Sequence, residues 1–205
     1  MAFVLGVTGG IATGKSTVVN FFKAQGFPVV DGDQIARAIV EPKMPALTDL
    51  TKAFGLEILK EGQLDRQKLG EIVFGDAKKR QQMDQILDGY LRKEITDQIK
   101  EASKTAPLVI ADIPLLYEAD YGQYMDQVAV VYIPEELQQK RLMERDHLTS
   151  AEAKKRMDSQ LSIEEKRQRA DILFDNQGTI DKTKEQVQSW LDQQGFTKNH
   201  EKING

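Results

Sequence analysis

The chain has 205 residues, enough for one ample domain or for one core with small insertions. Its formal net charge is −4, so no overall positive field would attract nucleic acid, and any anion site must be built from a few local residues. Because the chain has no cysteine, a disulfide framework, a thiolate nucleophile and a cysteine-based zinc site are excluded. The sequence has no basic leader and no run of about 18 apolar residues, and we expect a cytoplasmic protein without nucleic-acid or membrane partners.

The first predicted elements are a short buried strand over residues 2–7, a glycine-rich loop and a helix. The loop fits the phosphate-loop pattern G-x-x-x-x-G-K-[ST] from Gly9 to Ser16. Its glycines allow turns in which successive N–H groups face a phosphate chain, and the helix beginning near Gly14 adds its positive end. Lys15 would then contact the β- and γ-phosphates, and the Ser16 hydroxyl would bind Mg²⁺. The residues expected to hold ATP are Gly10, Ile11, Ala12, Thr13, Gly14, Lys15, Ser16 and Thr17.

A second buried strand is predicted over residues 28–30, and it leads into two acidic residues, Asp31 and Asp33. In an open parallel sheet, ligands gather at the carboxyl ends of the strands. One carboxylate there can act as a general base and the other as an orienting or metal-linked group. Alternatively, one of them caps the helix expected to begin at Gln34; for Asp33, which lies directly before this helix, capping and catalysis are compatible.

Residues 41–103 interrupt the alternation of strand and helix. Pro42 and Pro45 form an elbow, and the sequence from there to about residue 103 is helical in character with no convincing strand. We predict an all-helical insertion that holds the phosphoryl acceptor, with plain scaffolding as the alternative. Its clearest helix has an apolar face that we expect to be core, made of Met83, Ile86, Leu87, Tyr90, Leu91, Ile95 and Ile99.

Three further buried strands are predicted at residues 107–112, 128–133 and 172–174. Their near-continuous apolar runs are typical of parallel strands covered on both faces. The first ends in Asp112, as in a Walker-B-like strand whose carboxylate lies near Mg²⁺. The last ends in a turn at residues 175–178, at the edge of the sheet where the nucleotide is expected.

A charge-rich segment runs from residue 135 to about 170. Capping-box patterns that start at Thr149 and Ser162 predict short helices there. Arg141 and Arg145 are four positions apart and share one side of a helix, from which they could close over bound ATP. For each of the other basic residues, the expected position is an ordinary solvated face of a helix. These residues are Lys140, Lys154, Lys155, Arg156, Lys166, Arg167 and Arg169.

Together these motifs resemble those of the dephospho-CoA kinase family, in the family's order over nearly the whole chain. Two elements, D-x-D-x-I-A-R and P-L-L-[FY]-E, are far more specific than the phosphate loop alone. The matching segments are residues 7–17, 30–37, 40–42, 64–69, 72–74, 113–118, 170–171 and 175–178, with Arg141, Arg145, Asp146, Arg156 and Gln160. The family usually has His-Pro after Leu87, whereas this chain has Asp88-Gly89, so the resemblance implies neither the helix geometry nor an acceptor contact at this point, while the phosphate chemistry is unaffected.

The resemblance implies ATP-dependent phosphorylation, with Mg²⁺, of the ribose 3′-hydroxyl of dephospho-CoA, the last step of coenzyme A synthesis. It implies that Asp33 accepts the hydroxyl proton, that Arg141 stabilises charge from a lid, and that Asn176 lies near the adenine. The residues implied to bind the acceptor are Asp33, Arg37, Leu115, Leu116, Glu118, Arg156 and Gln160.

The resemblance also implies an α/β, P-loop NTPase-like fold, with a five-stranded parallel sheet flanked by helices. The expected parts are a core of residues 1–40, 104–135 and 170–197, a helical acceptor-binding insertion of residues 41–103, a mobile lid of residues 136–169 and a frayed tail of residues 198–205.

Two other functions fit some of these features. A kinase of another small hydroxylated acceptor, such as a nucleoside, shikimate or a sugar acid, would use the same phosphate loop and lid arginines. A switch that binds and slowly hydrolyses GTP would need an Asn/Thr-Lys-x-Asp sequence for guanine. Thr51-Lys52 does not continue in that way, so guanine recognition is not predicted.

Overall fold

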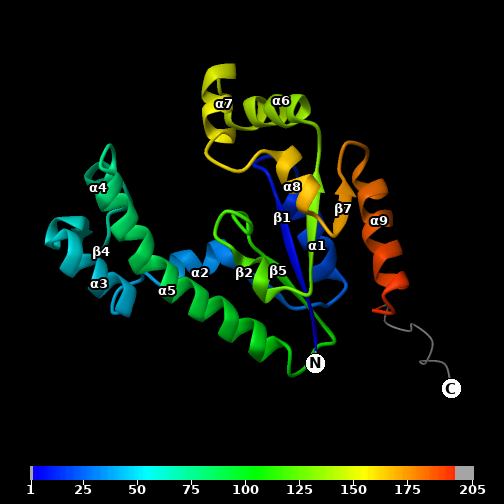
Figure 1. The fold of residues 1–205 in the computed structure, drawn as a ribbon, viewed down its shortest axis with the longest axis horizontal. Helices are drawn as coiled ribbons and strands as arrows, with labels where there is room; N and C mark the ends of the chain where they lie inside the picture. The colour runs from blue at the N-terminus through cyan, green and yellow to red at the C-terminus, as the bar shows by residue number, and fades with distance from the viewer. Residues whose placement is uncertain (1, 197–205) are drawn as a thin grey trace. The chain divides into compact units, whose positions relative to one another are not determined.

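The computed structural model describes residues 2–196 (Figure 1). The predicted tail at residues 198–205 lies outside this range. By its internal contacts the chain divides into two compact units: the first comprises Met1–Val30 and Ile99–Gly205, and the second comprises Asp31–Gln98.

The first unit is built on a parallel sheet in the order β2-β5-β1-β6-β7, and the predicted α/β fold with five parallel strands is confirmed (Figure 1). In its register, Val7 lies beside Asp112 and Gly9 lies beside Val131, so the carboxyl ends of the three central strands meet at one edge. The strands are β1 (Phe3–Gly9), β2 (Val29–Asp31), β5 (Leu108–Asp112), β6 (Gln127–Tyr132) and β7 (Ile172–Asp175).

Helices α1 (Lys15–Ala24) and α9 (Ile180–Gln193) form one core with this sheet. Aromatic side chains are central to that core, because the ring of Phe22 on α1 lies edge-on to Trp190 on α9, with 6.1 Å between the ring centroids. The other helices of this unit are α6 (Glu135–Asp146), α7 (Ser150–Met157) and α8 (Ile163–Arg169), with a short 3-10 turn η2 (Tyr121–Tyr124). Both predicted capping boxes are present, at Thr149 and at Ser162.

The second unit is mostly helical, but the expectation that it contains no strand is wrong. A small antiparallel hairpin joins β3 (Leu59–Lys60) to β4 (Gln63–Leu64). Its two-residue turn has positive φ at both positions, 52° at Glu61 and 77° at Gly62, as a type I′ turn requires. The strands have only two residues each, so no alternating pattern could indicate them. The remaining elements are α2 (Gly32–Ala38), α3 (Pro45–Phe54), η1 (Leu56–Ile58), α4 (Arg66–Val73) and α5 (Ala77–Ala102).

Helix α5 runs without interruption through Asp88 and Gly89, so the departure from the family pattern does not break it. Asp88 forms an ion pair with Arg92, one turn later on the same helix, at 2.7 Å. The apolar face that was expected to be core is only partly so: Ile95 and Ile99 are buried, whereas the five residues before them are half-buried.

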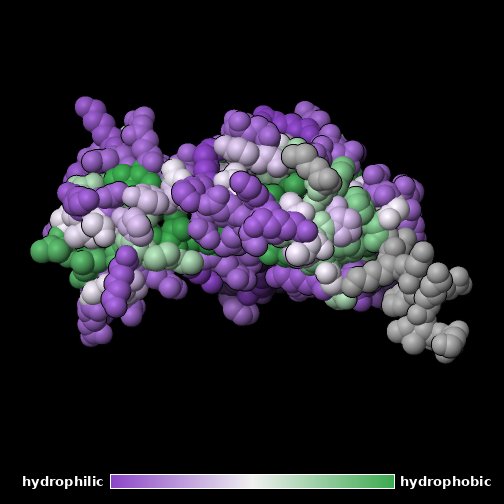
Figure 2. Space-filling model, turned by 90° about the horizontal axis from the view of Figure 1, so that it is seen from below, coloured by the Kyte–Doolittle hydropathy of each residue, from purple (hydrophilic) through white to green (hydrophobic). Residues whose placement is uncertain are grey.

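In the part of the chain that the structure describes, none of the helices has the length and apolar character that crossing a bilayer requires. Figure 2 shows a face on which hydrophilic side chains predominate and hydrophobic ones emerge in places. The most exposed large hydrophobic side chains, those of Leu56 and Phe74, both belong to the second unit.

Candidate active site

The phosphate loop connects β1 to α1, and two of its residues have positive φ angles. Gly14 has φ of 86° and directly precedes α1. A Cβ added there would lie 2.0 Å from Nδ2 of Asn176, so both the backbone conformation and the available space require glycine. Ala12 has φ of 61°, which is costly for a residue with a Cβ and is typical of sites where function fixes the backbone.

Asn176 holds this loop from the end of β7. Its Nδ2 donates to the carbonyl oxygen of Thr13 at 2.7 Å, and its Oδ1 accepts a hydrogen bond from Oγ1 of Thr183 at 2.8 Å. Only 6% of Asn176 is exposed. The resemblance implied that Asn176 lies near the adenine; in the structure its amide group is engaged with the loop backbone.

Several backbone N–H groups of the loop have no acceptor in the part of the chain that the structure describes. The N–H of Ile11 donates to Gln160, and the N–H of Thr13 donates to the carbonyl oxygen of Gly10. By contrast, the N–H groups of Ala12, Gly14, Lys15 and Ser16 have no acceptor among the described residues. Two of these four belong to the first turn of α1, whose positive dipole end adds to the attraction for an anion. The arrangement suits a phosphate chain.

Lys15 forms an ion pair with Asp112, which is the last residue of β5. Both side chains are largely buried, so this pair interacts more strongly than a surface pair would. Asp112 is the carboxylate that the sequence assigned to a Walker-B-like strand. The structure brings it together with the phosphate-loop lysine, as the register of β1 and β5 requires.

Ser16 is exposed at the start of α1, and its hydroxyl has no hydrogen bond among the described residues. Mg²⁺ in kinases takes one or two protein oxygens and completes its shell with phosphate oxygens and water. A single hydroxyl beside the phosphate loop fits that requirement. In the described part of the chain, no cluster of three or more acidic or histidine side chains could form an all-protein cage for an ion.

The segment expected to be a lid contacts the phosphate loop at Ile11. Gln138 on α6 donates from Nε2 to the carbonyl oxygen of Ile11, and Oε1 of Gln160 accepts from its N–H, both at 2.9 Å. The side chains of Ile11 and Ala12 also pack against an apolar cluster in α6 and α7, formed by Leu142, Ala153 and Met157.

The role of Gln138 was not predicted. A Cβ on Gly10 would lie 2.3 Å from its Nε2, so the second loop glycine leaves the space that this amide occupies. The sequence has no signal that separates Gln138 from its neighbour Gln139, which bonds Ser150 instead.

The arginines of the same segment differ in their partners. Arg145 and Arg156 both pair with Asp146, at 2.8 and 2.7 Å. The hydrogen bond from Arg145, with the charges of both arginines and of His147, holds the pKa of Asp146 below its ordinary value. Arg141 is half-buried and has no ion pair among the described residues. Arg169 also has no ion pair there, but its guanidinium lies 5.9 Å from the centre of the Tyr117 ring, so Arg141 is the better placed of the two for an anionic ligand.

The turn after β5 carries three of the residues expected to bind the acceptor. Leu115 is 44% exposed, whereas Leu116 is fully buried and fits against the space left by Gly6. The prediction that Leu116 contacts the acceptor can therefore concern only its backbone. Oε1 of Glu118 accepts from the ammonium group of Lys166 at 2.8 Å and from the N–H of Leu161 at 3.0 Å.

Lys166 was expected to be a solvated surface residue, and that expectation is wrong. It lies on the buried face of α8, one turn after Ile163, and its side chain has no exposed surface. Burial lowers its pKa, the partner Glu118 opposes this effect, and the charge of Lys15 adds to the lowering. The three-residue spacing from Ile163 was the one signal that could have indicated its burial.

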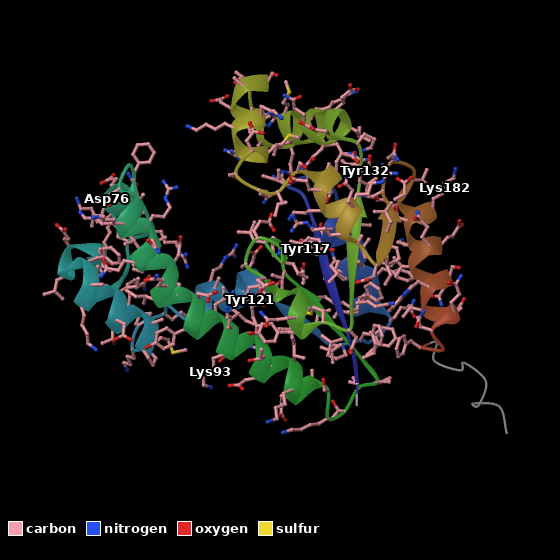
Figure 3. The ribbon with its side chains drawn as sticks, in the orientation of Figure 1. Asp76, Lys93, Tyr117, Tyr121, Tyr132 and Lys182 are labelled. Carbon is pink, nitrogen blue, oxygen red and sulfur yellow. The ribbon has the colours of Figure 1, made fainter. Side chains whose placement is uncertain are left out.

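The rest of α8 is also fixed to the core of the first unit. The hydroxyl of Tyr132 donates to Glu164 at 2.6 Å, and the guanidinium of Arg167 lies 4.8 Å from the centre of the Tyr132 ring. The hydroxyl of Tyr117 donates to the carbonyl oxygen of Arg169 at 2.9 Å. Figure 3 labels both tyrosines, which approach α8 from β6 and from the turn after β5. The bond to Glu164 raises the pKa of Tyr132.

The second unit begins with the acidic pair. Asp31 caps α2, accepting from the backbone N–H and from the side-chain amide of Gln34, both at 3.0 Å. Asp33 lies in the first turn of α2, so its proposed role as the cap is wrong: the helix begins at Gly32, earlier than expected. The Asp33 side chain is exposed and has no hydrogen bond among the described residues. Arg37 is exposed in the last turn of α2.

Comparisons with known proteins agree over nearly the whole chain. A family model described as “CoaE: Dephospho-CoA kinase” matches residues 3–182. The chain is 57% identical to the dephospho-CoA kinase of Enterococcus faecalis over 195 residues, which are 95% of this chain and 98% of that protein. It is 45% identical to the dephospho-CoA kinase of Bacillus licheniformis, over 94% of this chain and 96% of that protein. Among solved structures, the dephospho-CoA kinase from Campylobacter jejuni has a TM-score of 0.74 and 31% identity, covering 96% of this chain and 98% of that chain.

Proposed function

The chain belongs to the dephospho-CoA kinase family and is an ATP-dependent kinase, and we propose that its acceptor is the ribose 3′-hydroxyl of dephospho-CoA. The products would be ADP and coenzyme A. The main support is the family match over nearly the whole chain, joined to a phosphate loop with several N–H groups that have no acceptor within residues 2–196. A cytoplasmic location is part of the proposal.

In this proposal the phosphate loop holds ATP through the N–H groups of Ala12, Gly14, Lys15 and Ser16. The ammonium group of Lys15 moves from Asp112 to the β- and γ-phosphates, where the charge is greater. The loop residues from Gly10 to Thr17 line the nucleotide, and the Ser16 hydroxyl holds Mg²⁺. The metal ion would neutralise charge on the phosphates. Catalysis of phosphoryl transfer depends mainly on positioning the reactants and on stabilising the charge of the transition state, and these groups supply both.

Asp33 is the proposed general base. The acceptor oxygen forms a bond to the γ-phosphorus while the bond from that phosphorus to the β–γ bridging oxygen breaks. The hydroxyl proton passes to Asp33, and ADP leaves. The choice of Asp33 over Asp31 is supported by their hydrogen bonds, because the carboxylate of Asp31 is occupied as a helix cap while that of Asp33 is free of partners among the described residues.

Arg141 is proposed to stabilise charge on the transferred phosphoryl group. Of the lid arginines, Arg145, Arg156 and Arg167 form ion pairs and Arg169 lies over the ring of Tyr117, whereas Arg141 has neither kind of contact among the described residues. Asn176 is proposed to border the nucleotide as well as to hold Thr13. The acceptor is proposed to contact Asp33, Arg37, Leu115, Leu116, Glu118, Arg156 and Gln160.

Within the predicted lid, residues 136–169, we propose that α6 and α7 form the part that moves. Helix α8 is held to the first unit by Lys166, Tyr132 and Tyr117, whereas α6 and α7 contact the phosphate loop mainly through Gln138 and a small apolar cluster. The second unit is proposed to carry the acceptor-binding surface.

Mass spectrometry of the products tests the proposal directly. Incubation with ATP, Mg²⁺ and dephospho-CoA should give a product that is heavier by one phosphoryl group and identical to coenzyme A on chromatography. Shikimate, gluconate and a nucleoside, offered separately, test the rival acceptors, and Lys15→Ala is the matched inactive control. Turnover of one of these compounds with none of dephospho-CoA would overturn the proposal. A product with the phosphoryl group on another hydroxyl would overturn the proposed position of transfer.

A further inference from the structure

Lys166 is a completely buried cation that the proposed chemistry does not use. Its ammonium group donates to Oε1 of Glu118 at 2.8 Å and to the carbonyl oxygen of Pro114 at 2.9 Å, and it lies 3.5 Å from the carbonyl oxygen of Gly9. An ammonium group has three N–H donors, and these three oxygens account for all of them. Each oxygen belongs to a segment at the carboxyl edge of the sheet.

These contacts join three parts of the first unit at one point. Gly9 is the first residue of the phosphate-loop motif, Pro114 and Glu118 belong to the turn after β5, and Lys166 comes from α8. Further bonds strengthen the junction, because Thr8 donates from Oγ1 to the carbonyl oxygen of Pro114 at 2.9 Å. The N–H of Leu161 donates to the same Glu118 oxygen that Lys166 contacts.

Attaching a helix through a buried ion pair has a large desolvation free energy. Two charges must leave water, and a well-packed apolar pair of similar volume often stabilises a protein equally well. Helix α8 already has apolar anchorage through Ile163, which packs with Val130 and Tyr132. The charge of Lys166 is therefore better explained by the positions that it gives to Gly9, Pro114 and Glu118 than by a gain in stability.

We propose that Lys166 is a positioning residue for phosphoryl transfer, which fixes the start of the phosphate loop against the turn at residues 114–118. Its positive charge also adds to that of Lys15 at the same edge of the sheet. Glu118 then acts as the counter-charge of Lys166, in addition to its proposed contact with the acceptor. The inference rests on the proposed function, since it assumes that the phosphate loop and this turn serve one reaction.

Three variants test the inference: Lys166→Met, Glu118→Gln and the double variant. Glutamine at position 118 keeps an oxygen for the N–H of Leu161 but removes the charge. Each is compared with Lys155→Met, which changes an exposed lysine on α7. The measurements are kcat, KM for both substrates, the ATP dissociation constant and the melting temperature.

We expect Lys166→Met to lower kcat by about 10- to 100-fold, the scale of a small misplacement of reacting groups, and to weaken ATP binding. The double variant should regain melting temperature, because no buried charge is left unpaired, but its kcat and ATP affinity should stay low. If the ion pair were purely structural, the activity of the double variant would recover together with its stability. The Lys155→Met control should match the wild type.

The inference is overturned if the double variant binds ATP within about twofold of the wild type, because a lower kcat alone would also follow from a lost contact between Glu118 and the acceptor. If Lys166→Met alone does not fold, Glu118→Gln and the double variant still decide the question. If the wild type does not phosphorylate dephospho-CoA, the proposed function fails, whereas the ATP dissociation constants of the same variants continue to test Lys166.

Discussion

Replacing Gly14 by alanine is expected to destabilise the first unit and to prevent normal ATP binding. Gly14 has φ of 86°, and a Cβ there would lie 2.0 Å from Nδ2 of Asn176. That amide is not the free end of a flexible side chain, because it is bonded to Thr13 on one side and to Thr183 on the other. Alanine can therefore be accommodated only if Asn176 leaves its position.

The cost has two parts. The left-handed conformation raises the conformational energy of a residue with a Cβ by about 1 to 2 kcal/mol. Displacing Asn176 breaks two hydrogen bonds, each with a net contribution of about 1 kcal/mol. The sum is about 3 to 4 kcal/mol, which for a chain of this size corresponds to a fall in melting temperature of roughly 6 to 16 °C.

Thermal unfolding and ATP titration measure both effects, and Gly89→Ala is the matched control. Gly89 lies inside α5 with no atom within 4 Å of an added Cβ, so alanine there should stabilise the chain by about 0.5 to 1 kcal/mol. In an Asn176→Ala background, Gly14→Ala should cost only the conformational part, about 1 to 2 kcal/mol. A loss below about 0.5 kcal/mol in the single Gly14→Ala variant, with ATP affinity unchanged, would refute the reasoning.

Three further predictions concern the chemistry and the pH dependence. Lys15→Ala should leave the fold intact and lower kcat by about 10² to 10³, measured by coupled assay, and retention of more than about a tenth of the rate would contradict its assignment. Asp33→Asn should lower kcat by roughly 10² or more with ATP affinity little changed, whereas Asp31→Asn should remain active, because asparagine caps helices as well as aspartate does. Burial, with the charge of Asp171, raises the pKa of Tyr117 to about 12, so its stabilising effect is present below pH 10 and is lost as the pH rises toward 12. A pH series of melting temperatures should show a larger loss in the wild type than in Tyr117→Phe, in which Tyr132, whose pKa is also raised, still contributes.

The features that the sequence predicted well are those that depend on neighbouring residues. The phosphate loop lies between a strand and a helix because a run of buried residues and a glycine pattern specify both locally. The capping boxes at Thr149 and Ser162 were predicted correctly for the same reason, since each joins a side chain to a backbone group three residues away.

The features that the sequence did not predict depend on partners far along the chain. Lys166 is buried because it meets Gly9, which is 157 positions away, and Gln138 holds Ile11 across 127 positions. The sequence next to a lysine or a glutamine can be the same whether its side chain is in water or buried against a distant segment of the chain. The hairpin of β3 and β4 was missed for a different reason, because its strands are too short to show a period.

The groups that hold the phosphate loop explain why its anion site can work in an acidic chain. Gln138, Gln160 and Asn176 fix the loop backbone with neutral amides. Carboxylates in these positions would repel phosphate by roughly 4 kcal/mol for each charge within about 4 Å, at an effective dielectric constant of about 20. Two carboxylates at this edge are paired with lysines, Asp112 with Lys15 and Glu118 with Lys166. When ATP draws Lys15 toward its phosphates, the carboxylate of Asp112 no longer faces the Lys15 ammonium group, and it is then a suitable second oxygen ligand for Mg²⁺ or for its water shell.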